Sequence, residues 1–143
     1  MYSYSTDGVN SEKEYLERYP GDDLIDVVAF DKYDRDPFYK KTLKFCAELV
    51  STYAKEKGKI AAVSETGGLL AKNHNWWMEV FDILEPYDLS YVLTWRNPYA
   101  PTDHGAYGPT PDCPANKSFI EFYNQPKTVF QEEIDSKNIY QKH

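Results

Sequence analysis

The segment Ile60-Ala-Ala-Val-Ser-Glu-Thr-Gly-Gly68 decides the fold class of this chain. Its first four residues are apolar and predict a short buried strand, which a glutamate and two glycines follow. A similar apolar run precedes it at residues 24–30, and another follows it at residues 89–94. Near-continuously apolar strands are typical of parallel sheets that are buried on both faces.

Helical segments separate these strands. Asp36 before Pro37 indicates a helix start, because the aspartate oxygen can accept from free backbone amides and proline needs no such partner. Apolar residues then recur at three- and four-residue spacing until Gly58 ends the helix. Weaker patterns predict helices over 76–84 and 116–123, a further turn within 128–134 and the end of another strand at 2–5. Alternating strands and helices predict an α/β fold with a parallel sheet.

Composition excludes several classes of protein. Aromatic residues make up 16% of the 143 residues, too many for a disordered acidic chain. Lys and Arg number 16 against 23 Asp and Glu, a net charge of −7 with no basic patch, so nucleic acid is not an expected partner. No apolar run approaches the roughly 18 residues of a membrane helix, and the first residues do not resemble a signal peptide. The sequence has neither a metal-ligand spacing nor a glycine-rich cofactor motif, so no metal and no cofactor are expected.

Polar and aromatic residues are predicted just after the end of each strand. They are Asp31 and Tyr33 after the first, Glu65 after the second, and Trp95, Arg96 and Asn97 after the third. In a (β/α)₈ barrel these positions line the active site, but a full barrel takes about 250 residues. We therefore expect residues 1–143 to form the C-terminal half of a barrel, with open sheet edges through which the chain could self-associate.

Each candidate residue also has a purely structural interpretation. Glu65 is held at the mouth of the sheet, where a substrate can approach, but it could equally cap the next helix or pair with a surface cation. Tyr33 could donate a hydrogen bond to Glu65, whereas Asp31 is expected to have a structural role. Trp95 offers a flat apolar face beside the donors of Arg96 and Asn97, which suits a sugar ring, or it could close the top of the core.

Several motifs together resemble glycoside hydrolase family 26, a group of bacterial β-mannanases. The matching segments are Tyr15 to Asp23, Val27 to Tyr33, Gly58 to Gly67, Trp76-Trp77, Tyr91 to Asn97 and the closing Phe119 to Tyr123. The resemblance implies a (β/α)₈ barrel that hydrolyses β-1,4-mannosidic bonds with retention of configuration. It implies that Glu65 is the nucleophile on strand seven, that Tyr33 contacts it from strand six and that Asp31 supports the site. It also implies that Trp95 stacks under the sugar and that Arg96 and Asn97 bind neighbouring units.

One part of the family pattern is missing. A retaining glycosidase needs a second carboxyl group as general acid. In this family it is a glutamate on strand four, usually after a histidine, and no such pair occurs here. We therefore expect a fragment, strands five to eight of an extracellular or periplasmic endo-β-1,4-mannanase acting on mannan, which lacks its acid/base. The alternatives are a catalytically inert half-barrel, or a β-glucanase or β-1,3-xylanase of the same family.

Overall fold

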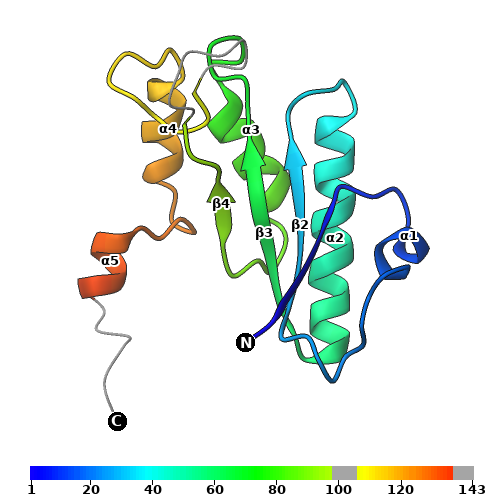
Figure 1. The fold of residues 1–143 in the computed structure, drawn as a ribbon. Coiled ribbons are helices and arrows are strands. Elements are labelled where there is room, and N and C mark those ends of the chain that lie inside the picture. Colours follow the sequence, from blue (N-terminus) through cyan, green and yellow to red (C-terminus); the bar gives the residue numbers. More distant parts are fainter. Residues whose placement is uncertain (98–105, 137–143) are drawn as a thin grey trace.

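The computed structural model describes residues 1–97 and 106–136. Its centre is a four-stranded sheet of β1 (Ser3–Asp7), β2 (Val27–Tyr33), β3 (Ile60–Gly67) and β4 (Val92–Thr94). The strands lie in chain order and every neighbouring pair is parallel (Figure 1). The predicted α/β class with a parallel sheet is therefore confirmed.

Five helices complete the described part of the chain. They are α1 (Glu12–Leu16), α2 (Tyr39–Lys57), α3 (Trp76–Leu84), α4 (Asn116–Tyr123) and α5 (Gln131–Ser136). The side chain of Asp36 accepts from the backbone N–H of Phe38 at 2.8 Å just before α2, and Gly58 ends α2 in the left-handed conformation at φ 65°. The predicted end at Gly58 is confirmed, whereas the helix begins at Tyr39 with Phe38 as its N-cap, so Asp36 caps only the turn before it. No helix within the described ranges is long and apolar enough to cross a membrane.

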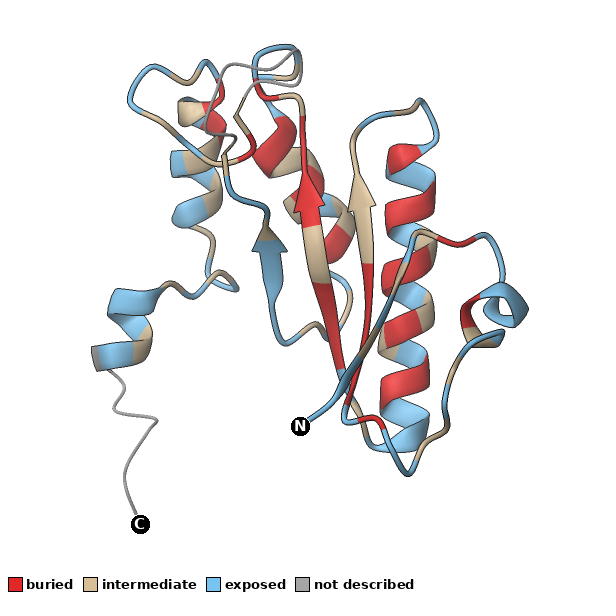
Figure 2. Ribbon diagram, in the orientation of Figure 1, coloured by how far each residue is buried: buried red, intermediate tan, exposed pale blue. Residues whose placement is uncertain are grey.

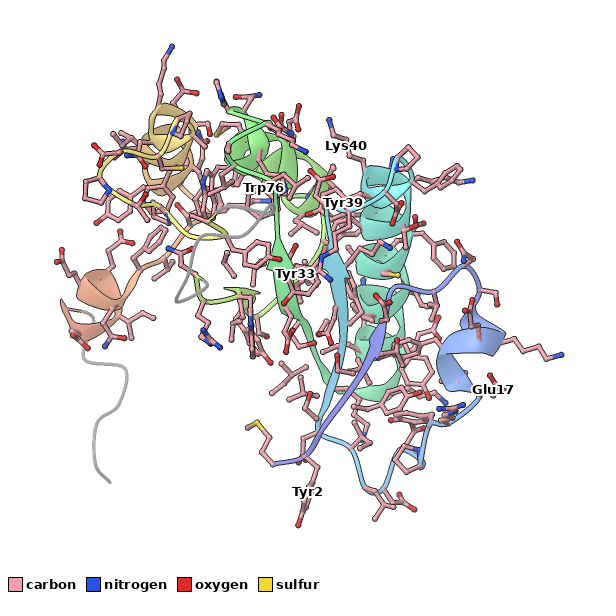
Figure 3. The ribbon with its side chains drawn as sticks, turned by 45° about the horizontal axis from the view of Figure 1, so that its top comes forward. Tyr2, Glu17, Tyr33, Tyr39, Lys40 and Trp76 are labelled. Atoms are coloured by element: carbon pink, nitrogen blue, oxygen red, sulfur yellow. The ribbon has the colours of Figure 1, made fainter. Side chains whose placement is uncertain are left out.

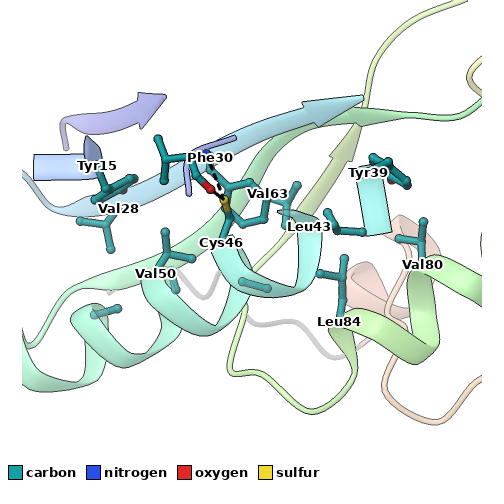
Figure 4. Packing of buried hydrophobic residues seen from close by; sticks show 14 of the residues in the cluster. Tyr15, Val28, Phe30, Tyr39, Leu43, Cys46, Val50, Val63, Val80 and Leu84 are labelled. Atoms are coloured by element: carbon teal, nitrogen blue, oxygen red, sulfur yellow. Dashed lines mark hydrogen bonds between the residues drawn. The ribbon is translucent and has the colours of Figure 1, made fainter. Parts of the chain in front are cut away.

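The main hydrophobic core lies between the sheet and the helices α2 and α3. Phe30 of β2 and Val63 of β3 pack there against Leu43 and Cys46 of α2 (Figure 4). Buried residues accordingly form a stripe along one side of α2, whereas β4 is mostly exposed (Figure 2). Burial of this stripe fixes the helices on one face of the sheet, which we call the helix face.

The other face of the sheet, which we call the inner face, carries the candidate site. Val27, Ala29 and Ala62 form a separate small cluster there. Because side chains alternate along a strand, Asp31 and Tyr33 lie on the same face of β2 as Val27 and Ala29. The first half of the inner face is therefore apolar and its carboxyl end is polar.

A β-bulge brings Glu65 to the inner face. Phe30 pairs with Val63, but the next residue, Asp31, pairs with Glu65, so Ser64 is an extra residue in β3. Paired residues of parallel strands have side chains on the same face, which places Glu65 beside Asp31. Without the bulge, Glu65 would share the helix face with Val63.

Three details of the predicted strands are wrong. The strand predicted at 24–30 lies at Val27–Tyr33, and Leu24 is 60% exposed. Asp31, Tyr33 and Glu65 were predicted after the strands and instead lie within them, because the pairing of β2 with β3 continues to Gly67. The strand predicted at 89–94 is only Val92–Thr94 and is not buried on both faces, because β4 has one neighbouring strand within the described residues.

Candidate active site

The centre of the candidate site is a hydrogen bond between two neighbouring strands. The Tyr33 hydroxyl donates to Glu65 Oε2 at 2.8 Å, and both side chains are half-buried. Burial raises the pKa of the Tyr33 phenol, and the hydrogen bond to the Glu65 carboxylate raises it further. The hydroxyl therefore remains a donor over the whole neutral pH range. Among the described residues, no Lys or Arg lies within ion-pair distance of Glu65.

Asp31 is held next to Glu65 by two serines from the flanking strands. Its Oδ1 accepts from Ser64 at 2.7 Å and from Ser5 at 3.1 Å, and the two serine hydroxyls lie 2.5 Å apart. Ser64 is the extra residue of the bulge, so the same irregularity that turns Glu65 inward also supplies a partner for Asp31. These contacts fix the Asp31 side chain on the inner face.

Two residues that the sequence analysis did not select surround Tyr33. The Arg35 guanidinium lies over the Tyr33 ring, 4.5 Å from its centroid, and donates to the Tyr107 hydroxyl at 2.9 Å. The Tyr107 ring packs edge-on against Tyr33 with centroids 5.5 Å apart. Figure 3 shows Tyr33 at the carboxyl end of β2. Arg35 and Tyr107 are 72 positions apart, so no local motif could have identified them.

The two glycines after Glu65 allow aromatic rings to approach the end of β3. A Cβ on Gly67 would lie 2.5 Å from Cδ1 of Tyr107, and one on Gly68 would lie 2.3 Å from Cδ1 and Nε1 of Trp76. Trp76 is 1% exposed, and Trp77 beside it is also buried, so both rings pack in the core. The strand end that carries Glu65 is thus enclosed by rings.

The third predicted group lies at the end of β4. Trp95 is 41% exposed, and its backbone N–H donates to the carbonyl of Thr66, the residue after Glu65. Arg96 Nη1 approaches the carbonyl of Asn97 at 3.4 Å. Asn97 Oδ1 accepts from the backbone amides of Tyr107 at 2.8 Å and Gly108 at 2.7 Å. Asn97 therefore holds the loop that carries Tyr107.

A large cleft is separate from the Glu65 carboxylate. A cleft of about 1020 Å³ lies between β4, α3 and α4, and residues 95–97 contribute to its wall, but Glu65 and Tyr33 do not line it. Its other walls are mainly apolar, with Trp77 and Phe122 among them. We place the candidate site at Glu65, because a nucleophile or proton carrier needs a positioned titratable group and a hydrogen bond from Tyr33 holds the Glu65 carboxylate at the edge of the sheet.

The described residues offer no group of three or more His, Cys, Asp or Glu side chains that could hold a metal ion. Cys46 and Cys113 are both free thiols, the first buried and the second half-buried. The side chains that meet at the site are a carboxylate, a phenol and a second aromatic ring.

In (β/α)₈ barrels the active-site side chains lie at the carboxyl ends of the parallel strands, which is where Glu65 and Tyr33 lie in this sheet. The family model described as "Glycosyl hydrolase family 26" matches residues 1–100, and the chain belongs to this family. The resemblance found in the sequence is confirmed.

Relatives of known structure show the same fold. A GH26 β-mannanase from Bacteroides ovatus superposes with a TM-score of 0.82 and 35% identity, over 90% of this chain and 38% of that one. The catalytic domain of a GH26 endo-β-1,4-mannanase from Bacillus sp. JAMB-750 gives a TM-score of 0.85 and 26% identity, over 99% of this chain and 42% of that one. The four-stranded sheet is therefore part of a TIM barrel.

A curated relative is the mannan endo-1,4-β-mannosidase of Bifidobacterium adolescentis, which is 30% identical over 68% of this chain and 12% of that protein. This chain thus spans about two fifths of the two solved structures and a smaller share of the curated relative.

Proposed function

We propose that this chain carries the nucleophile of a retaining endo-β-1,4-mannanase and that Glu65 is that nucleophile. The observation that carries the proposal is the 2.8 Å hydrogen bond from the Tyr33 hydroxyl to Glu65 Oε2 at the carboxyl edge of the sheet. A donor on Oε2 orients the carboxylate and leaves Oε1 for attack on the sugar. Family membership and relatives named as mannanases support the choice of mannan as substrate.

In this mechanism Glu65 attacks the anomeric carbon of a mannosyl unit. A glycosyl ester forms and the bond from that carbon to the leaving oxygen breaks, while a general acid protonates the leaving oxygen. Water then hydrolyses the ester. Asp31 pairs with Glu65 in the sheet, but it accepts hydrogen bonds from Ser5 and Ser64, which suits a supporting residue better than a proton donor. We assign the general acid to no residue of the described chain.

The substrate wall in this proposal is the end of β4. Trp95 is exposed enough to stack against the apolar face of a mannose ring, as aromatic side chains do with sugar C–H groups. Arg96 supplies donors for sugar hydroxyls beside it. The Asn97 amide is engaged with the loop of Tyr107 and Gly108, so its contribution to sugar binding includes the placement of that loop.

The assignment of Glu65 is tested by covalent trapping. A 2-deoxy-2-fluoro-mannotrioside with a dinitrophenolate leaving group needs no general acid, because the leaving group departs as a stable anion, and the fluorine slows hydrolysis of the ester. We expect the intact mass to rise by that of one 2-deoxy-2-fluoro-mannotriosyl group and the adduct to map to Glu65. Glu65→Gln, which keeps the shape but not the charge, should form no adduct. An adduct on another residue, or none on the folded wild-type chain, would refute the assignment.

The choice of mannan is tested with polysaccharides. The protein is incubated with mannan, mixed-linkage β-glucan and β-1,3-xylan, and reducing ends are measured. Cleavage of mannan alone supports the proposal, and preferential cleavage of either other polymer replaces mannan with that substrate. Because intact mannan is too large to cross a membrane, we also propose that the protein acts outside the cytoplasm.

A second candidate is a chain that is inert until another part of a barrel covers its edges. The observation that favours it is the exposure of β4 and its flanks, where Tyr91, Val92 and Leu93 are all exposed although apolar or aromatic. Exposed apolar edge strands pair with other chains. Light scattering at several concentrations measures self-association, and mannan hydrolysis by the monomeric fraction alone would exclude the inert interpretation.

A further inference from the structure

Tyr33 reaches Glu65 from between two other side chains. The Arg35 guanidinium lies over the Tyr33 ring at 4.5 Å from its centroid, and the Tyr107 ring packs edge-on against it at 5.5 Å. The two neighbours are joined to each other by the hydrogen bond from Arg35 Nη2 to the Tyr107 hydroxyl, 2.9 Å long. Arg35, Tyr107 and Tyr33 therefore form a closed ring of contacts around the phenol.

We propose that Arg35 and Tyr107 are positioning residues, which together clamp Tyr33 so that its hydroxyl points at Glu65. The proposal rests on the proposed function only for its catalytic meaning, since the clamp itself is a property of the folded chain. Within the described ranges, no hydrogen bond or ion pair joins Arg35 or Tyr107 to Glu65, so we expect both to act through Tyr33.

The phenol needs such support because its own backbone does not determine its direction. Tyr33 is the last residue of β2, and beyond it the chain turns away toward α2. A tyrosine side chain at a strand end has several open rotamers. Contacts on the ring by a cation and by an aromatic edge favour one of them, because the ring face is electronegative and guanidinium stacks on it.

The clamp is itself anchored on the loop that follows β4. Tyr107 is 7% exposed and its ring lies against the α-carbon of Gly67, where no other residue would leave room. Asn97 Oδ1 accepts from the Tyr107 backbone N–H at 2.8 Å and fixes the loop from the other side. Residues at the ends of three neighbouring strands, β2, β3 and β4, therefore together determine where the Tyr33 hydroxyl points.

The experiment is a double-mutant cycle read at Tyr33 in the absence of sugar. The chain is labelled with 3-fluorotyrosine, whose phenol ionises at lower pH than tyrosine, and the ¹⁹F signal of Tyr33 is assigned from its loss in Tyr33→Phe. The pKa of Tyr33 is then measured with Glu65 and with Glu65→Gln in the wild-type, Arg35→Met and Tyr107→Phe backgrounds. The effect of Glu65→Gln reports the Tyr33–Glu65 interaction, because direct effects of Arg35 on the phenol cancel in the cycle.

In the wild-type background we expect Glu65→Gln to lower the pKa of Tyr33, since it removes a carboxylate that disfavours the phenolate. In the Arg35→Met and Tyr107→Phe backgrounds the decrease should be less than half as large. Lys57→Met is the matched control, because Lys57 lies 5.8 Å from the centroid of the Tyr53 ring, away from the site, and its removal should leave the decrease unchanged. Arg35→Lys, which keeps the charge without the planar group, should restore only part of the decrease.

If Glu65→Gln lowered the pKa of Tyr33 equally in all backgrounds, the proposed role of Arg35 and Tyr107 would be refuted. If Arg35→Met does not fold, Tyr107→Phe decides, since it removes a single oxygen and keeps the ring. The titration involves no substrate, so its failure beside a successful trapping of Glu65 refutes only the clamp. If the decrease in the pKa of Tyr33 is smaller in these variants but Glu65 is not trapped, the proposed function is refuted and the clamp is supported.

Discussion

The substitution Gly68→Ala tests how tightly the strand end behind Glu65 is packed. The added Cβ would lie 2.3 Å from Cδ1 and Nε1 of the Trp76 ring and 2.5 Å from its Cε2. Ordinary carbon contacts lie at about 3.5–4.0 Å, so the ring or the strand has to move by more than about 1 Å. The indole has little freedom to do so, because it is buried and packs edge-on against Trp77 with centroids 4.9 Å apart.

Overpacking of this kind destabilises proteins by about 1–3 kcal/mol, and we expect a value near the upper end, about 2–3 kcal/mol. For a chain of this size, that corresponds to a decrease of roughly 10 °C in Tm. Gly108→Ala is the control, since its nearest atom would be Asn97 Oδ1 at 3.7 Å, and its effect should stay within about 1 kcal/mol.

Urea unfolding followed by tryptophan fluorescence gives the free energy of unfolding for each variant. Trp76→Phe removes the ring atoms that the new methyl group meets, so it should relieve part of the loss in the double variant. Equal stability of Gly68→Ala and wild type, or strictly additive effects in the double variant, would show that this contact is not what fixes the end of β3.

Three further outcomes are expected from the same unfolding assay. Leu43→Ala, at a fully buried position between α2 and the sheet, should lower the free energy of unfolding by about 2–5 kcal/mol, whereas Leu24→Ala on the surface should change it little; equal effects would contradict the assigned core. Burial raises the pKa of the Cys46 thiol to about 11, so the folded chain keeps the proton longer than the unfolded chain, whose thiols ionise near about 8.5. Stability should therefore fall as the pH rises from about 8.5 through 11, and this loss should be smaller in Cys46→Ala; equal losses would contradict the shift. Ser64→Ala removes a hydroxyl that contacts Asp31 and the carbonyl of Phe30 and should lower the free energy of unfolding by about 1 kcal/mol, more than Ser5→Ala; the reverse order would contradict the assigned network.

Local signals in the sequence predicted the helices well. The end of α2 at Gly58 needed only a residue that tolerates positive φ, and the turn before α2 needed only the Asp36 side chain and Pro37. Strand limits were predicted less well, because they depend on pairing with other strands. Pairing with β3 extends β2 to Tyr33, although the apolar run ends at Phe30.

The candidate site was predicted in part. Tyr33 and Glu65 were selected from their place after apolar runs, and their hydrogen bond agrees with the predicted contact. Arg35 and Tyr107 were missed because their contact joins segments far apart in the chain, and only the packing of the loop against Gly67 brings them together. The bulge at Ser64 was missed as well, since an apolar run followed by polar residues is compatible with either register.

The bulge lets β3 carry one residue more than strict alternation allows and still present Glu65 on the inner face. Loops in an α/β fold tolerate insertions and deletions, since their ends keep the same distance whatever lies between them. Deletion of Ser64 would restore unbroken alternation in β3 and leave Glu65 paired with Asp31 on the inner face, but it would remove the hydroxyl that contacts Asp31 and the carbonyl of Phe30. Among relatives of this chain, gaps are thus expected mainly in the connections and, within β3, at the position of Ser64, whereas loss of the bulge without loss of a residue would turn Glu65 toward the helix face.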